Sequence, residues 1–172
     1  MEDKNKKYKD SEMHELIIKL GSDNGIEREK ARKALVKIGR GSIDFLMELL
    51  SHPKHIYRWE AVKTMEEIGD PISIPLLIQA LEDDKGDVRW IAAKGLIKLG
   101  SLSIKPLLKM LEQKSDSVLL LEGAHHVFFD LKENKVLPKG FPIDKLLTSL
   151  RTPDWVDSVK PLAYEILNGL KS

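Results

Sequence analysis

Apolar residues recur along the chain with the spacing of amphipathic helices, in a pattern that itself repeats. Three segments that begin at Arg28, Arg58 and Arg89 read REKARKALVKIG, RWEAVKTMEEIG and RWIAAKGLIKLG, and they align without gaps. Each segment has apolar residues three, seven and ten positions after its arginine, which places them on one face of a helix at about 100° per residue. The segments therefore predict three equivalent helices.

The same spacing continues to the end of the chain and gives five copies. In the last two copies Leu121 and Lys160 replace the arginine. The apolar positions are Ala31, Leu35 and Ile38; Ala61, Met65 and Ile68; Ala92, Leu96 and Leu99; Ala124, Phe128 and Leu131; and Ala163, Leu167 and Leu170. Five second helices with matching interior positions are predicted.

A second pattern precedes each of these helices. It reads SIDFLMELL, SIPLLIQAL and SIKPLLKML around Ile43, Ile74 and Ile104, and residues 13–20 and 143–150 complete the series. Each unit is thus a first helix, a short turn and a second helix. The glycines Gly39 and Gly69 follow the last apolar position, where a left-handed residue ends a helix; Gly100 does the same in the third copy.

The paired helices, the Val-Arg and Ala positions and the Gly-x-x-x-Ile joints resemble HEAT repeats of the phycocyanobilin-lyase-like class. The resemblance implies an all-α fold, a right-handed α-α superhelix of five helix pairs. The predicted units are 11–39, 40–69, 70–100, 101–132 and 141–170, within a single domain of residues 11–172. Residues 1–10 lack apolar periodicity and are expected to be flexible, and the Lys-, Pro- and Gly-rich stretch at 132–141 is predicted to be an inserted loop.

Composition narrows the possible functions. Basic and acidic residues number 28 and 27, so no strong net charge favours nucleic acid or a membrane surface as a partner. The chain has no cysteine, which excludes disulfides and thiolate chemistry. The first twenty residues match neither a signal peptide nor a membrane span, and we expect a cytoplasmic protein without a cofactor.

Equivalent positions of the second helices form rows on the predicted concave wall. The first row contains the residue after each repeat arginine or its replacement: Glu29, Trp59, Trp90 and Glu122. The second row lies four residues later and contains Lys33, Lys63, Lys94 and His126. Both rows lie away from the centre of the core face. We predict a binding groove formed by Trp59, Trp90, Lys63, Lys94, Glu122 and His126. The alternative is that both indoles complete the packing between units.

The repeated arginines allow two interpretations. Their guanidinium groups could bind phosphates or carboxylates of a ligand. The interpretation that we favour is structural: each arginine pairs with an acidic residue of an adjoining unit, for which Glu27, Asp83 and Asp87 are candidates.

Metal chemistry is disfavoured by the residues present. Glu122, His126 and Asp130 share one helical flank, and His125 lies beside them, but a single helix offers at most two ligands at good geometry. Deoxyhypusine hydroxylase, which is built from similar repeats, uses His-Glu pairs for a di-iron site. The comparable positions here are Trp59-Glu60 and Trp90-Ile91. No metal site and no catalytic residues are therefore predicted.

The sequence favours a non-catalytic scaffold that binds a protein or peptide on its concave face. An accessory or catalytic subunit of the bilin-lyase type, with a chromophore or small ligand beside His125 and His126, is the alternative. The protein is expected to be a monomer or a weak homo-oligomer. Self-association would use the apolar face of the last helix, with Val159, Leu162, Ile166 and Leu170.

Overall fold

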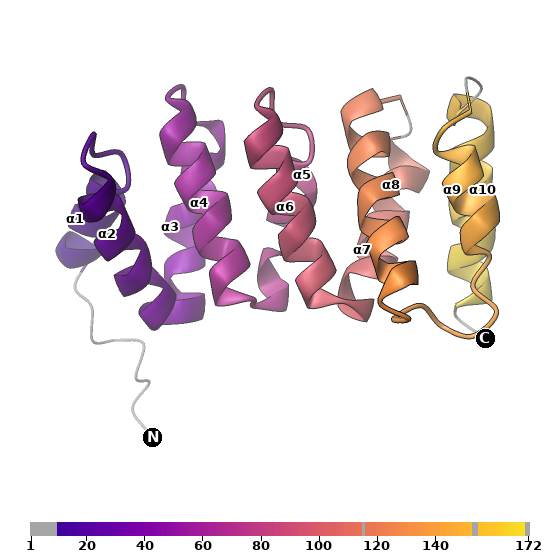
Figure 1. The fold of residues 1–172 in the computed structure, drawn as a ribbon, viewed down its shortest axis with the longest axis horizontal. Helices are drawn as coiled ribbons and strands as arrows, with labels where there is room; N and C mark the ends of the chain where they lie inside the picture. Colours follow the sequence, from indigo (N-terminus) through magenta and orange to yellow (C-terminus); the bar gives the residue numbers. More distant parts are fainter. Residues whose placement is uncertain (1–9, 115, 153–154, 171–172) are drawn as a thin grey trace.

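The computed structural model describes residues 10–114, 116–152 and 155–170, and all regular secondary structure in them is helical (Figure 1). The α-helices are α1 (Asp10–Lys19), α2 (Gly25–Ile38), α3 (Ile43–Glu48), α4 (His55–Ile68), α5 (Ile74–Ala80), α6 (Gly86–Leu99), α7 (Ser101–Gln113), α8 (Val118–Glu133), α9 (Ile143–Ser149) and α10 (Trp155–Gly169). The predicted all-α repeat of helix pairs is confirmed. Of the segment expected to be flexible, residues 1–9 lie outside the described residues and Asp10 begins α1.

The helices form two layers. Successive second helices pack on one another in the order α2, α4, α6 and α8, and these helices form the nearer row in Figure 1. The first helices lie behind them, with α5 against α7. Each pair thus buries its apolar faces partly against itself and partly against its neighbours, as expected for a solenoid.

The last pair departs from this order. Helix α9, although it is a first helix, packs on α8, whereas α10 packs mainly on α7 and α9. The final pair has therefore exchanged layers, and α9 continues the row of second helices. The prediction that Ala163 occupies the position equivalent to Ala124 is wrong: Ala163 is buried, but in the layer of α7.

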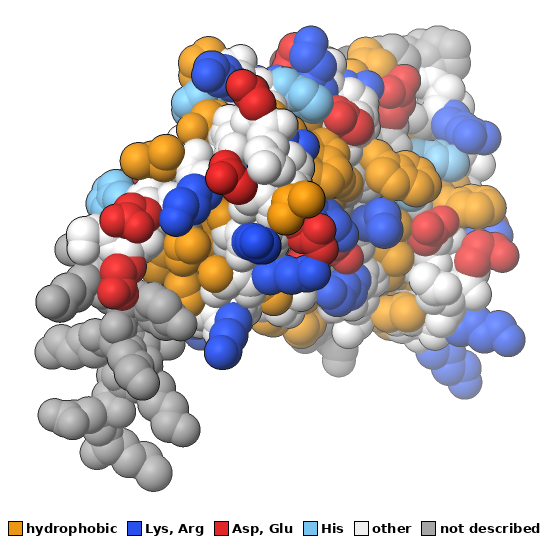
Figure 2. Space-filling model, turned by 60° about the vertical axis from the view of Figure 1, so that its left-hand side comes forward, with side chains coloured by type: hydrophobic (Ala, Val, Ile, Leu, Met, Phe, Trp, Pro, Cys, Tyr) orange, Lys and Arg blue, Asp and Glu red, His pale blue; other side chains and the backbone are white. Residues whose placement is uncertain are grey.

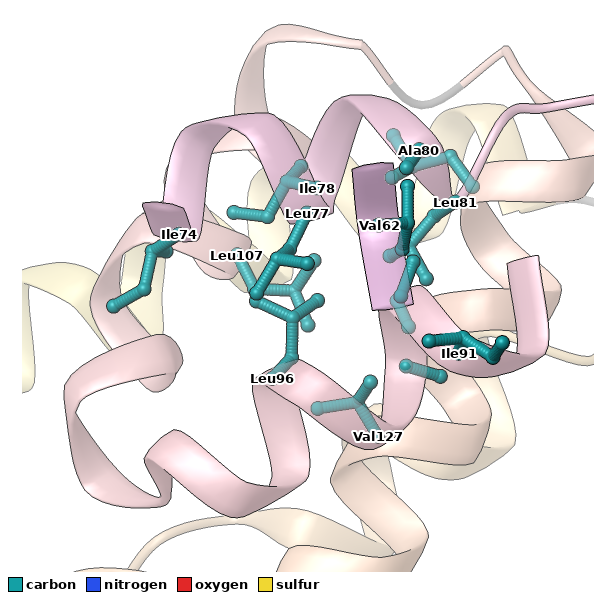
Figure 3. Packing of buried hydrophobic residues seen from close by; sticks show 14 of the residues in the cluster. Val62, Ile74, Leu77, Ile78, Ala80, Leu81, Ile91, Leu96, Leu107 and Val127 are labelled. Atoms are coloured by element: carbon teal, nitrogen blue, oxygen red, sulfur yellow. The ribbon is translucent and has the colours of Figure 1, made fainter. Parts of the chain in front are cut away.

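Small side chains are buried at equivalent positions of the second helices α2, α4, α6 and α8. Ala31, Ala61, Ala92 and Ala124 are all at most 1% exposed. They belong to one cluster of buried hydrophobic residues that extends from α1 to α10, and Figure 3 shows part of it, including Leu77, Leu96 and Leu107. Because neighbouring units share this cluster, each of them depends on the next for its buried surface.

One glycine marks a close approach between helices. A Cβ at Gly95 of α6 would lie 2.9 Å from Leu77 Cδ1 of α5 and 3.6 Å from Glu66 Cβ of α4. Leu77 is itself fully buried, so it has little room to move. The missing side chain therefore allows α6 to pack tightly between its two neighbours.

Glycine also ends three of the second helices, α2, α4 and α6. Gly69 has φ 65° and ψ 29°, the predicted left-handed cap, and its N–H bonds to the carbonyl of Met65. Gly39 and Gly100 also have positive φ, but their ψ values of −135° and −130° lie outside the left-handed helical region. The prediction of a left-handed cap is thus correct at Gly69 only, while all three positions require the conformational freedom of glycine.

The repeated arginines stabilise the turn inside each of the first three units. One guanidinium N–H of each donates to the backbone carbonyl six residues earlier: Arg28 to Ser22 at 2.7 Å, Arg58 to His52 at 2.9 Å, and Arg89 to Asp83 at 2.8 Å. The same bond therefore recurs at the turn between first and second helix in the first three units.

Two of these arginines also pair with an acid of the next unit. Arg58 Nε lies 2.7 Å from Asp83 Oδ2, and the group also contacts Asp84; Arg28 Nε lies 3.2 Å from Glu60 Oε1. Of the predicted acids, Asp83 is a partner. Glu27 instead accepts from Ser22 Oγ, and Asp87 lies 2.9 Å from His55 Nε2. The structural interpretation of the arginine row holds for these two arginines.

The apolar face of the last helix is covered by the chain itself. Val159, Leu162 and Ile166 are buried, and Leu170 is half-buried against the same core. The layer exchange turns these residues toward α7 and α9. Among the described residues of α10, these side chains therefore form no exposed apolar face through which the protein could self-associate.

Substituting Glu60 should show how strongly the units depend on these ion pairs. This carboxylate is only 2% exposed, and it pairs with both Arg28 and Arg32. In Glu60→Gln, the two half-buried arginines lose the negative charge with which both pair. We expect this loss to lower the free energy of unfolding by about 2 kcal/mol in urea at pH 7. Glu29→Gln, which breaks an exposed pair with Lys33, is the control and should leave the midpoint unchanged. Equal midpoints for Glu60→Gln and wild type would contradict this role.

Candidate binding groove

A groove of about 820 Å³ lies between α8 and α9. From α8 it is lined by Val118, Leu121, Glu122, His125, His126, Phe129 and Asp130, and from α9 and the turn after it by Leu147, Thr148, Leu150 and Arg151. Its lining is partly apolar and carries both signs of charge. A surface of this kind suits an amphipathic ligand.

The connection between the two helices determines where α9 lies. After α8 ends at Glu133, the side chains of Val136 and Phe141 pack against the core, and the Phe141 ring stacks on Phe128 at 6.0 Å. Lys132 Nζ then bonds to Asp144 Oδ1 at 2.8 Å across the two helices. These contacts hold the seven-residue α9 beside the sixteen-residue α8, so that the longer helix is covered only in part.

His125 lies in the groove with its ring stacked on Phe129 at 6.3 Å. Partial burial lowers the pKa of His125 below its ordinary value, and repulsion from Arg151 and His126 lowers it further. The imidazole is thus favoured in its neutral form, in which it can both donate and accept a hydrogen bond.

His126 joins the groove to α6. Its ring meets the indole of Trp90 edge to face at a centroid distance of 4.9 Å, and its Nε2 lies 3.8 Å from Asp130 Oδ2. Trp90 is nevertheless 55% exposed. The indole therefore contacts His126, while much of its surface remains open to solvent.

Trp59 occupies the equivalent position one unit earlier but has a different environment. The guanidinium of Arg32 lies over its ring, 5.9 Å from the centroid, and is held there by ion pairs to Glu60 and Glu67. The indole is half-buried and packs against the core. For Trp59 the packing interpretation is the better one.

The predicted groove residues thus separate into two groups. Glu122 and His126 line the groove, and Trp90 contacts it through His126. Lys63 is engaged by Glu66 and Glu67 at 2.6 and 3.3 Å, and, like Trp59, it does not line the groove. Lys94 is exposed on α6, one helical turn after Trp90, and is also absent from the lining.

Sequence reasoning missed several groove residues. Phe129 is 46% exposed and lies outside the predicted apolar positions, and Leu147 and Arg151 come from α9 and the turn after it. The one available signal was the run His125, His126 and Phe129 on a helix whose apolar stripe was already complete with Phe128 and Leu131.

In the described parts of the chain, no three His, Asp or Glu side chains come together in a way that could hold a metal ion, and no helix is sufficiently long and apolar to span a bilayer. Figure 2 shows basic, acidic and hydrophobic side chains intermixed on the face that it displays.

Comparison with known proteins identifies the repeat. A family model of HEAT repeats matches residues 13–97 and, in a second placement, residues 43–125. No curated protein matches the sequence. A chain in the complex of CpcE and CpcF of phycocyanin lyase from Nostoc sp. PCC7120 is similar in structure, with a TM-score of 0.58 and 22% identity, over 91% of this chain and 99% of that one. At this identity the likeness concerns the fold.

The lowered pKa of His125 predicts a pH dependence of stability. A histidine whose pKa is lowered in the folded protein binds a proton more readily in the unfolded chain. Its contribution to the free energy of unfolding is therefore present above about pH 6.5 and is lost as the pH falls below that value. The melting temperature of wild type should therefore drop more between pH 7.5 and pH 5.5 than that of His125→Gln. Identical drops in the two proteins would show that the groove does not perturb this imidazole.

Proposed function

The chain belongs to the HEAT-repeat family, and from this premise we propose that it is a non-catalytic scaffold that binds a protein or peptide on the face formed by its second helices. The observation that carries the proposal is the exposed indole of Trp90 beside the groove between α8 and α9. Trp is the residue most enriched at the energetic centres of protein interfaces.

Exposed apolar side chains extend this surface. Val118 and Phe129 are both 46% exposed, and they lie on the same helix as His126, which contacts Trp90. Large exposed apolar groups with polar residues at their rim are typical of a protein-binding patch rather than of scattered surface residues. Glu122, Asp130 and Arg151 supply the polar part of the lining.

The proposed binding set differs from the one expected from the sequence. Trp90, Glu122 and His126 remain in it, and Phe129 and Arg151 are added. Trp59 and Lys63 are removed, because Arg32 covers the first and glutamates hold the second. Lys94 stays at the margin as an exposed charge one turn from Trp90.

An accessory or catalytic subunit of the bilin-lyase type is the second candidate. It is favoured by the shared fold with the CpcE–CpcF chain and by the neutral His125 in an open groove. Mixing the purified protein with a linear tetrapyrrole should then change the visible absorption of the pigment, and His125→Ala should remove the change. An unaltered spectrum would eliminate this candidate.

The scaffold proposal predicts that the two tryptophans differ. In affinity capture from the native lysate, Trp90→Ala should reduce partner recovery at least tenfold while the melting temperature stays within about 1 °C of wild type. Trp59→Ala should retain the partner but lower the stability by about 2 kcal/mol, because its half-buried ring and the contact with Arg32 are lost.

The opposite pattern would contradict the proposal. If Trp90→Ala captured the same partners as wild type, or if it unfolded at a much lower temperature, the indole would be part of the packing. Circular dichroism of both variants shows whether the helical content is retained.

A further inference from the structure

We propose that the occupant of the groove is a peptide segment that presents a basic side chain, lysine or arginine, to the exposed face of Trp90 near Glu122. The inference rests on the proposed function, since it names the chemistry of the partner that binds there. The repeat contains an occupied and an open version of the same tryptophan position.

The occupied version is at Trp59. The indole carries a cation on its face, the guanidinium of Arg32 at 5.9 Å, and two carboxylates, Glu60 and Glu67, neutralise that cation. A cation over an indole ring is attracted by the negative face of the aromatic system, and an adjacent acid strengthens the arrangement. In this unit the protein supplies the cation itself.

The open version is at Trp90. In the repeat, Val62 of α4 is equivalent to Arg32 of α2, and Trp90 is equivalent to Trp59. Val62 therefore occupies, relative to Trp90, the position from which Arg32 covers Trp59. Val62 is fully buried and has no charge to offer. Trp90 consequently remains 55% exposed, and its surface is available to a cation from another molecule.

The charges around Trp90 favour that cation. Its ring touches His126, and Glu122 and Asp130 lie one helical turn to either side of His126 on α8. Glu122 is exposed, and it occupies the position of Trp90 in the next unit, so the two side chains come from neighbouring helices at the same level. A basic group on the indole would therefore lie beside a carboxylate.

Two basic residues oppose this attraction, and the one in the groove defines the orientation of the occupant. Lys94 is exposed one turn after Trp90 on α6, and Arg151 lines the groove from the turn after α9. Because Arg151 disfavours a second cation in the groove, the basic side chain fits on the Trp90 side of α8, where Lys94 weakens its binding. The apolar residues of the segment would lie along Val118, Phe129 and Leu147 in the groove, away from the α6 side.

Peptide display on the full chain supplies the probe. Random twelve-residue peptides are selected on the immobilised protein, and clones that Trp90→Leu fails to retain are synthesised with a fluorescent label. Each lysine or arginine is then replaced by its uncharged counterpart, norleucine for lysine and citrulline for arginine. Affinities are measured by fluorescence anisotropy at two salt concentrations.

The proposal predicts that one basic residue is shared by the selected peptides and that neutralising it weakens binding by about fivefold to tenfold. Glu122→Gln should weaken binding of the basic peptide by a similar factor but leave the affinity for the neutralised peptide unchanged. Lys94→Glu should strengthen binding of the basic peptide. Glu29→Gln, which alters the same row in the first unit, is the matched control and should change neither affinity.

The outcomes separate the two proposals. The selected peptides could require Trp90 and yet bind equally well after neutralisation, or they could share acidic residues instead of basic ones. Either result would overturn the basic-ligand inference and leave the scaffold function supported. If no peptide depended on Trp90, both would be contradicted. Melting curves of Trp90→Leu and Glu122→Gln that match wild type are required for either conclusion.

Discussion

No helix pair of this chain can bury its apolar side chains alone, and this constraint determines the rest of the structure. Ala31, Ala61, Ala92 and Ala124 belong to the buried cluster that neighbouring units share. The buried carboxylate of Glu60 and the pair of Arg58 with Asp83 link neighbouring units through directed bonds. Apolar contact thus brings the units together, while the ion pairs fix how each unit sits on the next.

The groove results from the way in which the helix pair α9 and α10 packs on α7 and α8. A fifth unit in the regular order would have placed the long, amphipathic α10 against α8. Instead α10 packs on α7, and the short α9 takes the place beside α8. Part of α8 is left uncovered, and His125, His126 and Phe129 become the lining of a groove. A local departure from the repeat therefore creates a distinctive surface on an otherwise regular solenoid.

The sequence predicted what depends on local periodicity. Helix positions, the buried alanines and the arginine–acid pair with Asp83 follow from patterns within one or two units. The layer of α10 did not follow, because the stripe containing Ala163 and Leu167 would suit either layer. The contrast between Trp59 and Trp90 was also hidden, since it depends on Arg32 and Val62 one unit earlier and not on the tryptophans themselves. Arg151 entered the site only through the exchange of layers.

The layer exchange can be measured directly, because the chain has no cysteine and accepts pairs of spin labels without background. One label at Glu122 of α8 is combined with a second at Thr148 of α9 or at Lys160 of α10, and both distances are measured by pulsed electron paramagnetic resonance. The structure predicts the shorter distance for the pair with Thr148, since both residues line the groove. A shorter distance to Lys160 would place α10 in the row of second helices and would contradict the origin of the groove.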